Sequence, residues 1–122
     1  MKITWIVLLL IVSVLSCKKE QELPGPYEAG WKGEKVCEII EDNTEYRVLK
    51  CTFPPGVGHE RHYHIPHFGY TLKGSKFRII DDSGTNDYDI PSGYSFSKYE
   101  GFLHEAINIG DSTAVFLIFE PK

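Results

Sequence analysis

The sequence predicts an all-β fold, either a sandwich, a jelly roll or a small barrel. From residue 36 onward, short runs of β-branched and aromatic residues alternate with turn-forming segments, and no stretch has the period of an amphipathic helix. The roughly 90 residues involved accommodate about seven or eight short strands. Because each strand buries only alternate side chains, it needs a facing sheet, which all three architectures provide.

The first 16 residues predict a secretory signal peptide. Lys2 precedes an apolar run over residues 3–15 that is too short to serve as a comfortable membrane span. Ser16 stands directly before Cys17, which resembles the lipobox of bacterial lipoproteins, and this resemblance implies that Cys17 is lipidated. The alternative is a signal-anchor helix that is never cleaved. In both cases the domain is exported and faces the periplasm or the cell surface.

Residues 17–30 predict a flexible tether, and residues 31–122 predict the folded domain. The tether begins with charged residues and continues with proline and glycine, without apolar periodicity. The whole chain has a formal net charge of −4 and shows no basic patch interleaved with aromatic residues. An acidic domain is repelled by nucleic acid, so no nucleic-acid partner is expected. The lipid anchor is the predicted contact with the membrane.

A hairpin is predicted where two strand-like runs, 36–40 and 45–53, flank a polar turn. A three-residue loop over 43–45 places two opposite-charge pairs directly across the hairpin: Glu38 with Lys50, and Glu41 with Arg47. Opposite charges stabilise facing positions of an antiparallel pair, so this register is favoured.

The same register places Cys37 opposite Cys51. Facing cysteines in an oxidising compartment can form a disulfide. The alternative is a pair of small buried thiols, and the sequence leaves both open.

The histidines are concentrated in one stretch of the chain, which contains His59, His62, His64 and His67. A strand projects residues i and i+2 from the same face, so His62 and His64 can present two imidazoles to one metal ion. Imidazole is a common ligand of late first-row metals, and His104 completes the site if the fold brings it near. The alternative is that these are ordinary surface histidines. His59 follows a Pro-Pro-Gly turn and is expected to be exposed.

The frame around these histidines resembles the two sequence motifs of the cupin superfamily. The first motif matches Gly56, His62, His64 and Gly74. The second motif matches Gly93, Gly101, His104 and Asn108. Two independently spaced motifs make the resemblance specific. It implies that residues 31–122 form a double-stranded β-helix, which is a jelly-roll barrel, and that pairing into a homodimer is expected.

Two positions depart from the cupin pattern. Tyr99 stands where the second motif usually has proline. His67 stands at the glutamate position of the first motif, with a spacer from His64 that is one residue short, so the chain must turn tightly at Pro66. The resemblance implies that His62, His64 and His104 bind one metal ion. His67 is the expected fourth ligand, and the alternative is that it lies beside the ligands without binding.

The cofactor implied by the resemblance is a divalent ion, with iron, manganese, nickel and zinc as the family's usual metals. Export in an unfolded state adds copper and weakens the case for iron, because the affinity order outside the cell favours copper and zinc. Neutral imidazole ligands leave the charge of the ion uncompensated, which favours an anionic or enolisable small molecule.

Three functions remain open from the sequence. The first is a metal-dependent enzyme of cupin type, such as an oxygenase or isomerase, that acts on a small molecule in the barrel mouth. The second is a non-catalytic module that captures a metal ion, a sugar or a small acid. The third is a purely structural barrel without metal. No catalytic acid–base pair is evident beside the predicted ligands.

Overall fold

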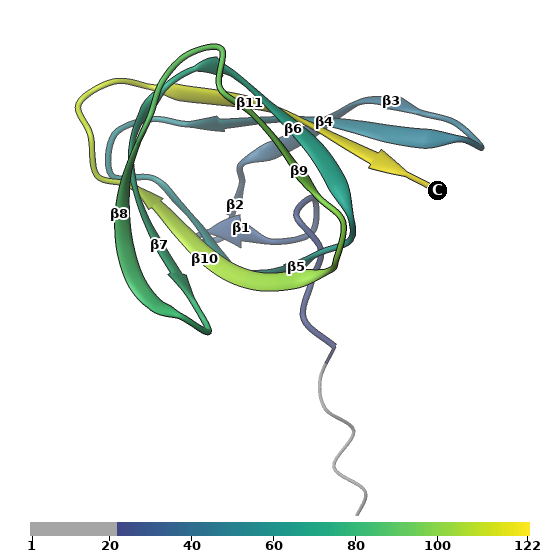
Figure 1. Cartoon of the computed structure of the whole chain (residues 1–122), viewed down its shortest axis with the longest axis horizontal. Coiled ribbons are helices and arrows are strands. Elements are labelled where there is room, and N and C mark those ends of the chain that lie inside the picture. The colour runs from purple at the N-terminus through teal and green to yellow at the C-terminus, as the bar shows by residue number, and fades with distance from the viewer. Residues whose placement is uncertain (1–21) are drawn as a thin grey trace, which may run out of the picture.

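A computed structural model describes residues 22–122 as an arrangement of β-strands joined by turns and loops (Figure 1). The strands are β1 (Gly30–Trp31), β2 (Glu34–Lys35), β3 (Cys37–Asp42), β4 (Tyr46–Phe53), β5 (Gly58–His64), β6 (His67–Lys73), β7 (Ser75–Asp81), β8 (Gly84–Ile90), β9 (Ser95–Lys98), β10 (Phe102–Asn108) and β11 (Ala114–Pro121). Among these residues, no helix is long and apolar enough to cross a membrane. The predicted signal peptide and Cys17 lie outside the described residues.

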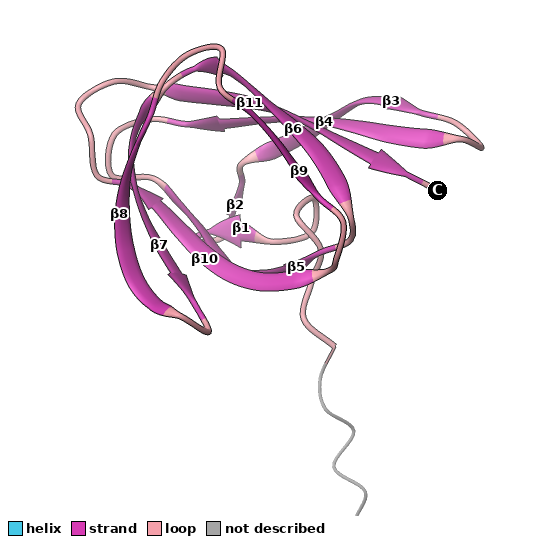
Figure 2. Cartoon of the chain, in the orientation of Figure 1, coloured by secondary structure: helices cyan, strands magenta, loops and turns pink. Residues whose placement is uncertain are grey.

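Two antiparallel sheets face each other and enclose the core. One has the strand order β5-β10-β7-β8, and the other has the order β3-β4-β11-β6-β9. Figure 2 shows the described chain as strands and loops curved around a common interior. The core residues are Val36, Cys37, Leu49, Cys51, Phe53, Phe77, Ala106, Ala114, Phe116 and Ile118. This arrangement confirms the predicted all-β barrel of the double-stranded β-helix type.

The barrel is open along one side, between β8 and β9. Each of these strands is the last in its sheet, and the two sheets are not joined by hydrogen-bonded pairing there. The residues of β8 up to Asp89 are exposed, as are Ser95, Ser97 and Lys98 of β9. The inner faces of both edge strands therefore border a path from solvent to the interior.

The first hairpin has the predicted loop and most of the predicted register. Cys37 pairs with Cys51 and Glu38 with Lys50, as expected, and the structure contains a disulfide between the two cysteines. The expected pairing of Glu41 with Arg47 is wrong. The register shifts between Ile39 and Glu41, so that Glu41 faces Val48 and Asp42 faces Arg47.

Arg47 instead forms an ion pair with a residue that is distant in the sequence. Its guanidinium donates to the carboxylate of Glu120 on β11, with a nitrogen–oxygen distance of 3.0 Å. Glu120 is only 4% exposed, and a buried carboxylate needs a partner much more than the exposed Glu41 does. The bulge in β3 is compatible with this pairing because it moves Glu41 away from the arginine.

The segment before β1 packs against the barrel. The amide of Tyr63 donates to the carbonyl of Pro24, and the amide of Ala29 donates to the carbonyl of Gly25. Pro26 and Ala29 are buried. The last residues of the expected tether before β1, from 24 to 29, therefore form a strap that is hydrogen-bonded to β5, and we call residues 24–29 the N-terminal strap.

The motif residues other than the histidines shape the turns and the end of β10. Gly93 has a φ of 84°, a conformation that glycine adopts without strain. Gly74 lies so close to the backbone of residues 90–92 that a Cβ atom would clash with it. Asn108 is fully buried; its amide donates to the carbonyls of Phe53 and Ser112, and its oxygen accepts from Ser75 and from the amide of Gly110. This side chain fixes the end of β10.

Candidate metal centre

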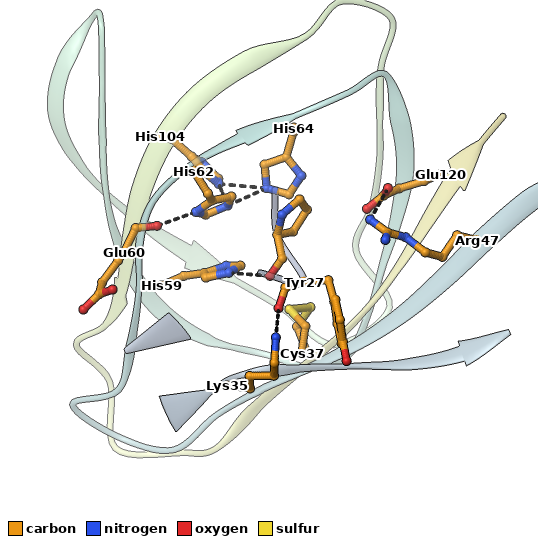
Figure 3. The surroundings of a disulfide bond; sticks show 12 residues. Tyr27, Lys35, Cys37, Arg47, His59, Glu60, His62, His64, His104 and Glu120 are labelled. Carbon is orange, nitrogen blue, oxygen red and sulfur yellow. Dashed lines mark hydrogen bonds and ion pairs between the residues drawn. A yellow bond between two sulfur atoms is a disulfide. The ribbon is translucent and has the colours of Figure 1, made fainter. Parts of the chain in front are cut away.

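Three histidine side chains converge inside the barrel. His62 and His64 project from the inner face of β5, and His104 projects from the neighbouring strand β10, where it pairs with His62 in the strand register. Their Nε2 atoms lie 2.8 Å (His62 to His64), 3.1 Å (His64 to His104) and 3.0 Å (His104 to His62) apart. Figure 3 shows the three rings pointing toward one another. The alternation of β5 and its pairing with β10 thus create one cluster of donors.

The protonation of these rings favours a cation at their centre. The Nδ1 atom of His62 lies 2.6 Å from the carbonyl oxygen of Glu60 and donates a proton to it. A neutral imidazole carries one proton, so Nε2 of His62 faces the other two rings with a lone pair. Three neutral rings cannot supply donors for all three Nε2 contacts while Nδ1 of His62 keeps its proton. A metal ion accepts all three lone pairs at once.

The spacing of the nitrogens also fits a metal ion. Imidazole nitrogens bind zinc at about 2.0–2.1 Å, so ligands at angles of about 90° to 110° are separated by about 2.9 to 3.4 Å. The three observed distances lie in or next to this interval. His62, His64 and His104 are therefore the residues that would hold the ion, and we call them the histidine triad.

Burial keeps the triad neutral, which metal binding requires. Removal from water lowers the pKa of His62 to about 2 and that of His104 to about 4, and it also lowers the pKa of His64. The neighbouring imidazoles act in the same direction, because each would repel a proton on the next. At neutral pH the lone pairs of the triad are therefore free.

His67 lies beside the triad but is not part of it. The short connection through Ile65 and Pro66 brings His67 to the interior, where it is 5% exposed and its ring centroid lies 4.6 Å from that of His64. Its Nδ1 atom donates to the carbonyl of Ile65 at 2.7 Å. The donor atoms that lie within 4.8 Å of one another come from the triad and do not include His67. The structure thus brings three of the four predicted ligands together.

Comparison with known proteins identifies the fold. No protein-family model matches the sequence, and no curated protein matches it. Among solved structures, a cupin domain from Bordetella pertussis is similar with a TM-score of 0.67 and 24% identity, over 83% of this chain and 97% of that one. A protein with a double-stranded β-helix domain from Klebsiella pneumoniae has a TM-score of 0.59 at 16% identity, over 74% and 79% of the two chains. The polyketide cyclase RemF from Streptomyces resistomycificus has a TM-score of 0.56 at 19% identity, over 78% and 73%.

The chain has the cupin fold. These similarities concern the fold alone, because the identities are below 25%. The triad lies inside this cupin barrel, on two adjacent strands of one sheet.

His59 is buried in the cupin barrel, so its expected exposure is wrong. Its side chain is 4% exposed and stacks on His62, with 3.7 Å between ring centroids and 29° between the planes. Its Nε2 atom donates to the carbonyl of Pro26 in the N-terminal strap at 2.8 Å. Burial lowers the pKa of His59 to about 4. A histidine that appeared to belong to a loop therefore lies within β5 and supports a triad member. Simple alternation would place His59 on the face opposite His62, but the register of β5 against β10 shifts between the pairs His62–His104 and His59–Ala106, and this irregularity turns His59 inward.

An internal cavity of about 140 Å³ adjoins the triad within the cupin barrel. His64 and His104 form part of its wall, and His59 and His67 also reach it. A larger groove of about 1000 Å³ runs along the open side between β8 and β9. Ile79, Ile90, Phe96, Phe102 and His104 border both spaces. The groove is therefore the route by which a small molecule would approach the triad.

Proposed function

We propose that the chain is a metal-binding protein of cupin type, in which the histidine triad holds one divalent ion and a small molecule binds beside it. The observation that carries this proposal is the meeting of three Nε2 atoms, each 2.8 to 3.1 Å from the other two, in the barrel interior. Buried groups of this kind need a partner, and three converging lone pairs need a cation.

The position of the cavity supports a site that is open to a small molecule. Catalytic metal sites keep a coordination position free, whereas structural sites are closed by four protein ligands. Three ligands converge here, and the cavity lies on the side of His64 and His104. When bound, a divalent ion supplies Lewis-acid polarisation or a site for oxygen chemistry. The surrounding protein residues hold the imidazole rings of the triad in place, keep them neutral and exclude bulk water.

A non-catalytic binding module is the second candidate, and the composition of the cavity favours it. Among the described residues that line the cavity, none has a carboxylate or an ammonium group. Proton transfer inside the barrel would therefore depend on His59 and His67, and each already has one ring nitrogen bonded to a backbone carbonyl. A protein that only captures a ligand needs no such group.

Export and membrane attachment are part of the proposal. The support for them is the apolar run over 3–15 followed by Cys17. Cys17→Ser should move the protein out of the membrane fraction or leave it unprocessed. Unchanged fractionation and mass would show instead that the apolar segment itself is the anchor.

Metal binding is tested by elemental analysis and calorimetric titration of the full chain with zinc and manganese. We expect one ion per chain, and we expect His104→Ala to lose most of the affinity because it removes one of three ligands. Asp111→Asn is a matched control, because Asp111 is exposed and lies outside the cavity and the groove. Equal stoichiometry and affinity in wild type and His104→Ala would contradict the proposal.

A further inference from the structure

The cavity beside the triad has the size of a single aromatic ring. Its volume is about 140 Å³, and a dry apolar cavity of about 150 Å³ is known to hold one benzene molecule. A sugar ring with its shell of hydroxyl groups would need hydrogen-bond partners that this cavity offers only at its histidines. The space therefore selects for a small molecule with an apolar body.

The wall of the cavity is aromatic. Five phenylalanines line it: Phe53, Phe77, Phe96, Phe102 and Phe116. Phe53 and Phe77 meet edge to face with centroids 5.6 Å apart, and Phe77 and Phe116 do so at 5.5 Å. Phe102 stacks on His64 at 5.1 Å and so connects this wall to the triad. A planar ring gains edge-to-face contacts in such surroundings beyond its apolar area.

The approach to the cavity carries negative charge. Of the ionisable residues along the groove, besides its tyrosines and His104, four are acidic and one is basic: Asp81, Asp82, Asp89, Glu100 and Lys98. Asp81 accepts hydrogen bonds from the amide of Ser83 at 2.8 Å and from its hydroxyl at 2.6 Å, and these bonds lower the pKa of Asp81. An anion would be repelled by these acidic residues, and the described lining of the cavity contains no lysine or arginine to pair with it. A neutral ligand is therefore favoured.

We infer that the cavity binds a small neutral aromatic molecule that carries a hydroxyl group, that is, a simple phenol. The ring occupies the space between the phenylalanines of the two sheets, and the hydroxyl oxygen lies at the triad. The placement of the hydroxyl group at a metal ion rests on the proposed function, whereas the fit of the ring does not. The sequence-based expectation was an anionic or enolisable ligand. The cavity and its acidic approach favour an uncharged ligand over an anion.

The first experiment uses the full chain at pH 8 after metal has been removed with a chelator. Phenol, toluene and benzoate are titrated while amide NMR shifts are recorded. We expect phenol and toluene to shift residues of the cavity wall, with benzoate at least tenfold weaker because its charge has no partner. Benzoate binding as tightly as phenol would overturn the inference of a neutral ligand.

The second experiment repeats the titrations with zinc-loaded protein. We expect zinc to strengthen phenol binding at least tenfold and to leave toluene binding unchanged, since toluene replaces the hydroxyl with a methyl group. Equal strengthening of both would overturn the placement of the hydroxyl at the triad. If the protein binds no zinc while phenol and toluene still bind, the proposed function fails and the ring site stands.

The third experiment locates the site by filling it. Ile118 lines the cavity, and the next residue, Leu117, does not. Ile118→Phe should weaken phenol binding at least tenfold with unchanged metal stoichiometry, and Leu117→Phe is the matched control that should bind like wild type. Ala106→Leu fills the same cavity from the other sheet and serves if Ile118→Phe does not fold. Unchanged phenol binding in a folded filling variant would show that the ring lies elsewhere.

Discussion

The ring of His59 stacks on the ring of His62, with their centroids 3.7 Å apart. His59 in turn donates to the carbonyl of Pro26, so a backbone atom of the N-terminal strap is connected to the triad through the imidazole of His59. The strap therefore helps to orient His62, in the manner of residues that contact a metal ligand without binding the metal.

Substitution of His59 should weaken metal binding without abolishing it. His59→Ala removes both the stack on His62 and the hydrogen bond to Pro26, and we expect zinc affinity to fall by about 10- to 100-fold. His59→Phe keeps a ring against His62 but loses the donor, so its loss should be smaller. Calorimetric titration with zinc measures both variants. An unchanged affinity in His59→Ala would mean that the stack has no influence on the triad.

His67 separates two interpretations of the first motif. Because its donor atoms lie outside the triad, we expect His67→Ala to keep one zinc per chain and to lose at most about 100-fold in affinity. A loss as large as that of His104→Ala would make His67 a ligand, as its place in the motif implies. His67→Glu adds a second readout, since only a ligand position should shift preference toward manganese, which favours carboxylate oxygen.

The metal-free protein should lose stability as the pH falls. The folded-state pKa values of His59 and His104 are about 4 and that of His62 is about 2, whereas an unfolded histidine has a pKa near 6.5. Above pH 6.5 both states are neutral. Below it the unfolded chain binds protons that the folded chain excludes, so each such imidazole costs about 1.4 kcal/mol of stability per pH unit.

Urea unfolding at pH 8 and pH 5 measures this effect. We expect a clearly lower unfolding free energy at pH 5, and a smaller difference in His59→Gln, which lacks one of the titrating groups. Equal stability of the wild-type protein at both pH values would show that the imidazoles are accessible to protons in the folded state.

Much of the fold and the triad was predictable because it depends on local periodicity and spacing. His62 and His64 share a strand face by alternation, and the second motif gave the position of His104. The burial of His59 was not predictable, because its partner is a backbone carbonyl in a segment whose composition indicates a tether. The bulge beside Glu41 escaped prediction for a similar reason: Arg47 pairs with Glu120, which is distant in sequence.

The size and polarity of the cavity could not be predicted from the sequence either. Alternating apolar residues predict that a strand has a buried face, but they do not say how completely the facing side chains fill the interior. Phe53 and Phe116 come from adjacent strands of one sheet, and Phe77 comes from the other. Only their packing leaves the space of about 140 Å³ beside the triad.

The disulfide between Cys37 and Cys51 should stabilise the barrel and influence its cavity. It joins the edge strand β3 to β4 across a sequence separation of 14, and Cys51 also lines the cavity. A cross-link that closes a loop of this length stabilises a protein by about 3 kcal/mol, mainly by restricting the unfolded chain.

Reductant should therefore lower the midpoint of thermal unfolding, and fewer free thiols should be counted in unfolded, unreduced protein than after reduction. The double variant Cys37→Ala, Cys51→Ala is the control, because its unfolding should not respond to reductant. If the wild-type protein shows both cysteines as free thiols and no response to reductant, the bond does not form in the protein, and the close packing of two thiols at this position stabilises the hairpin instead.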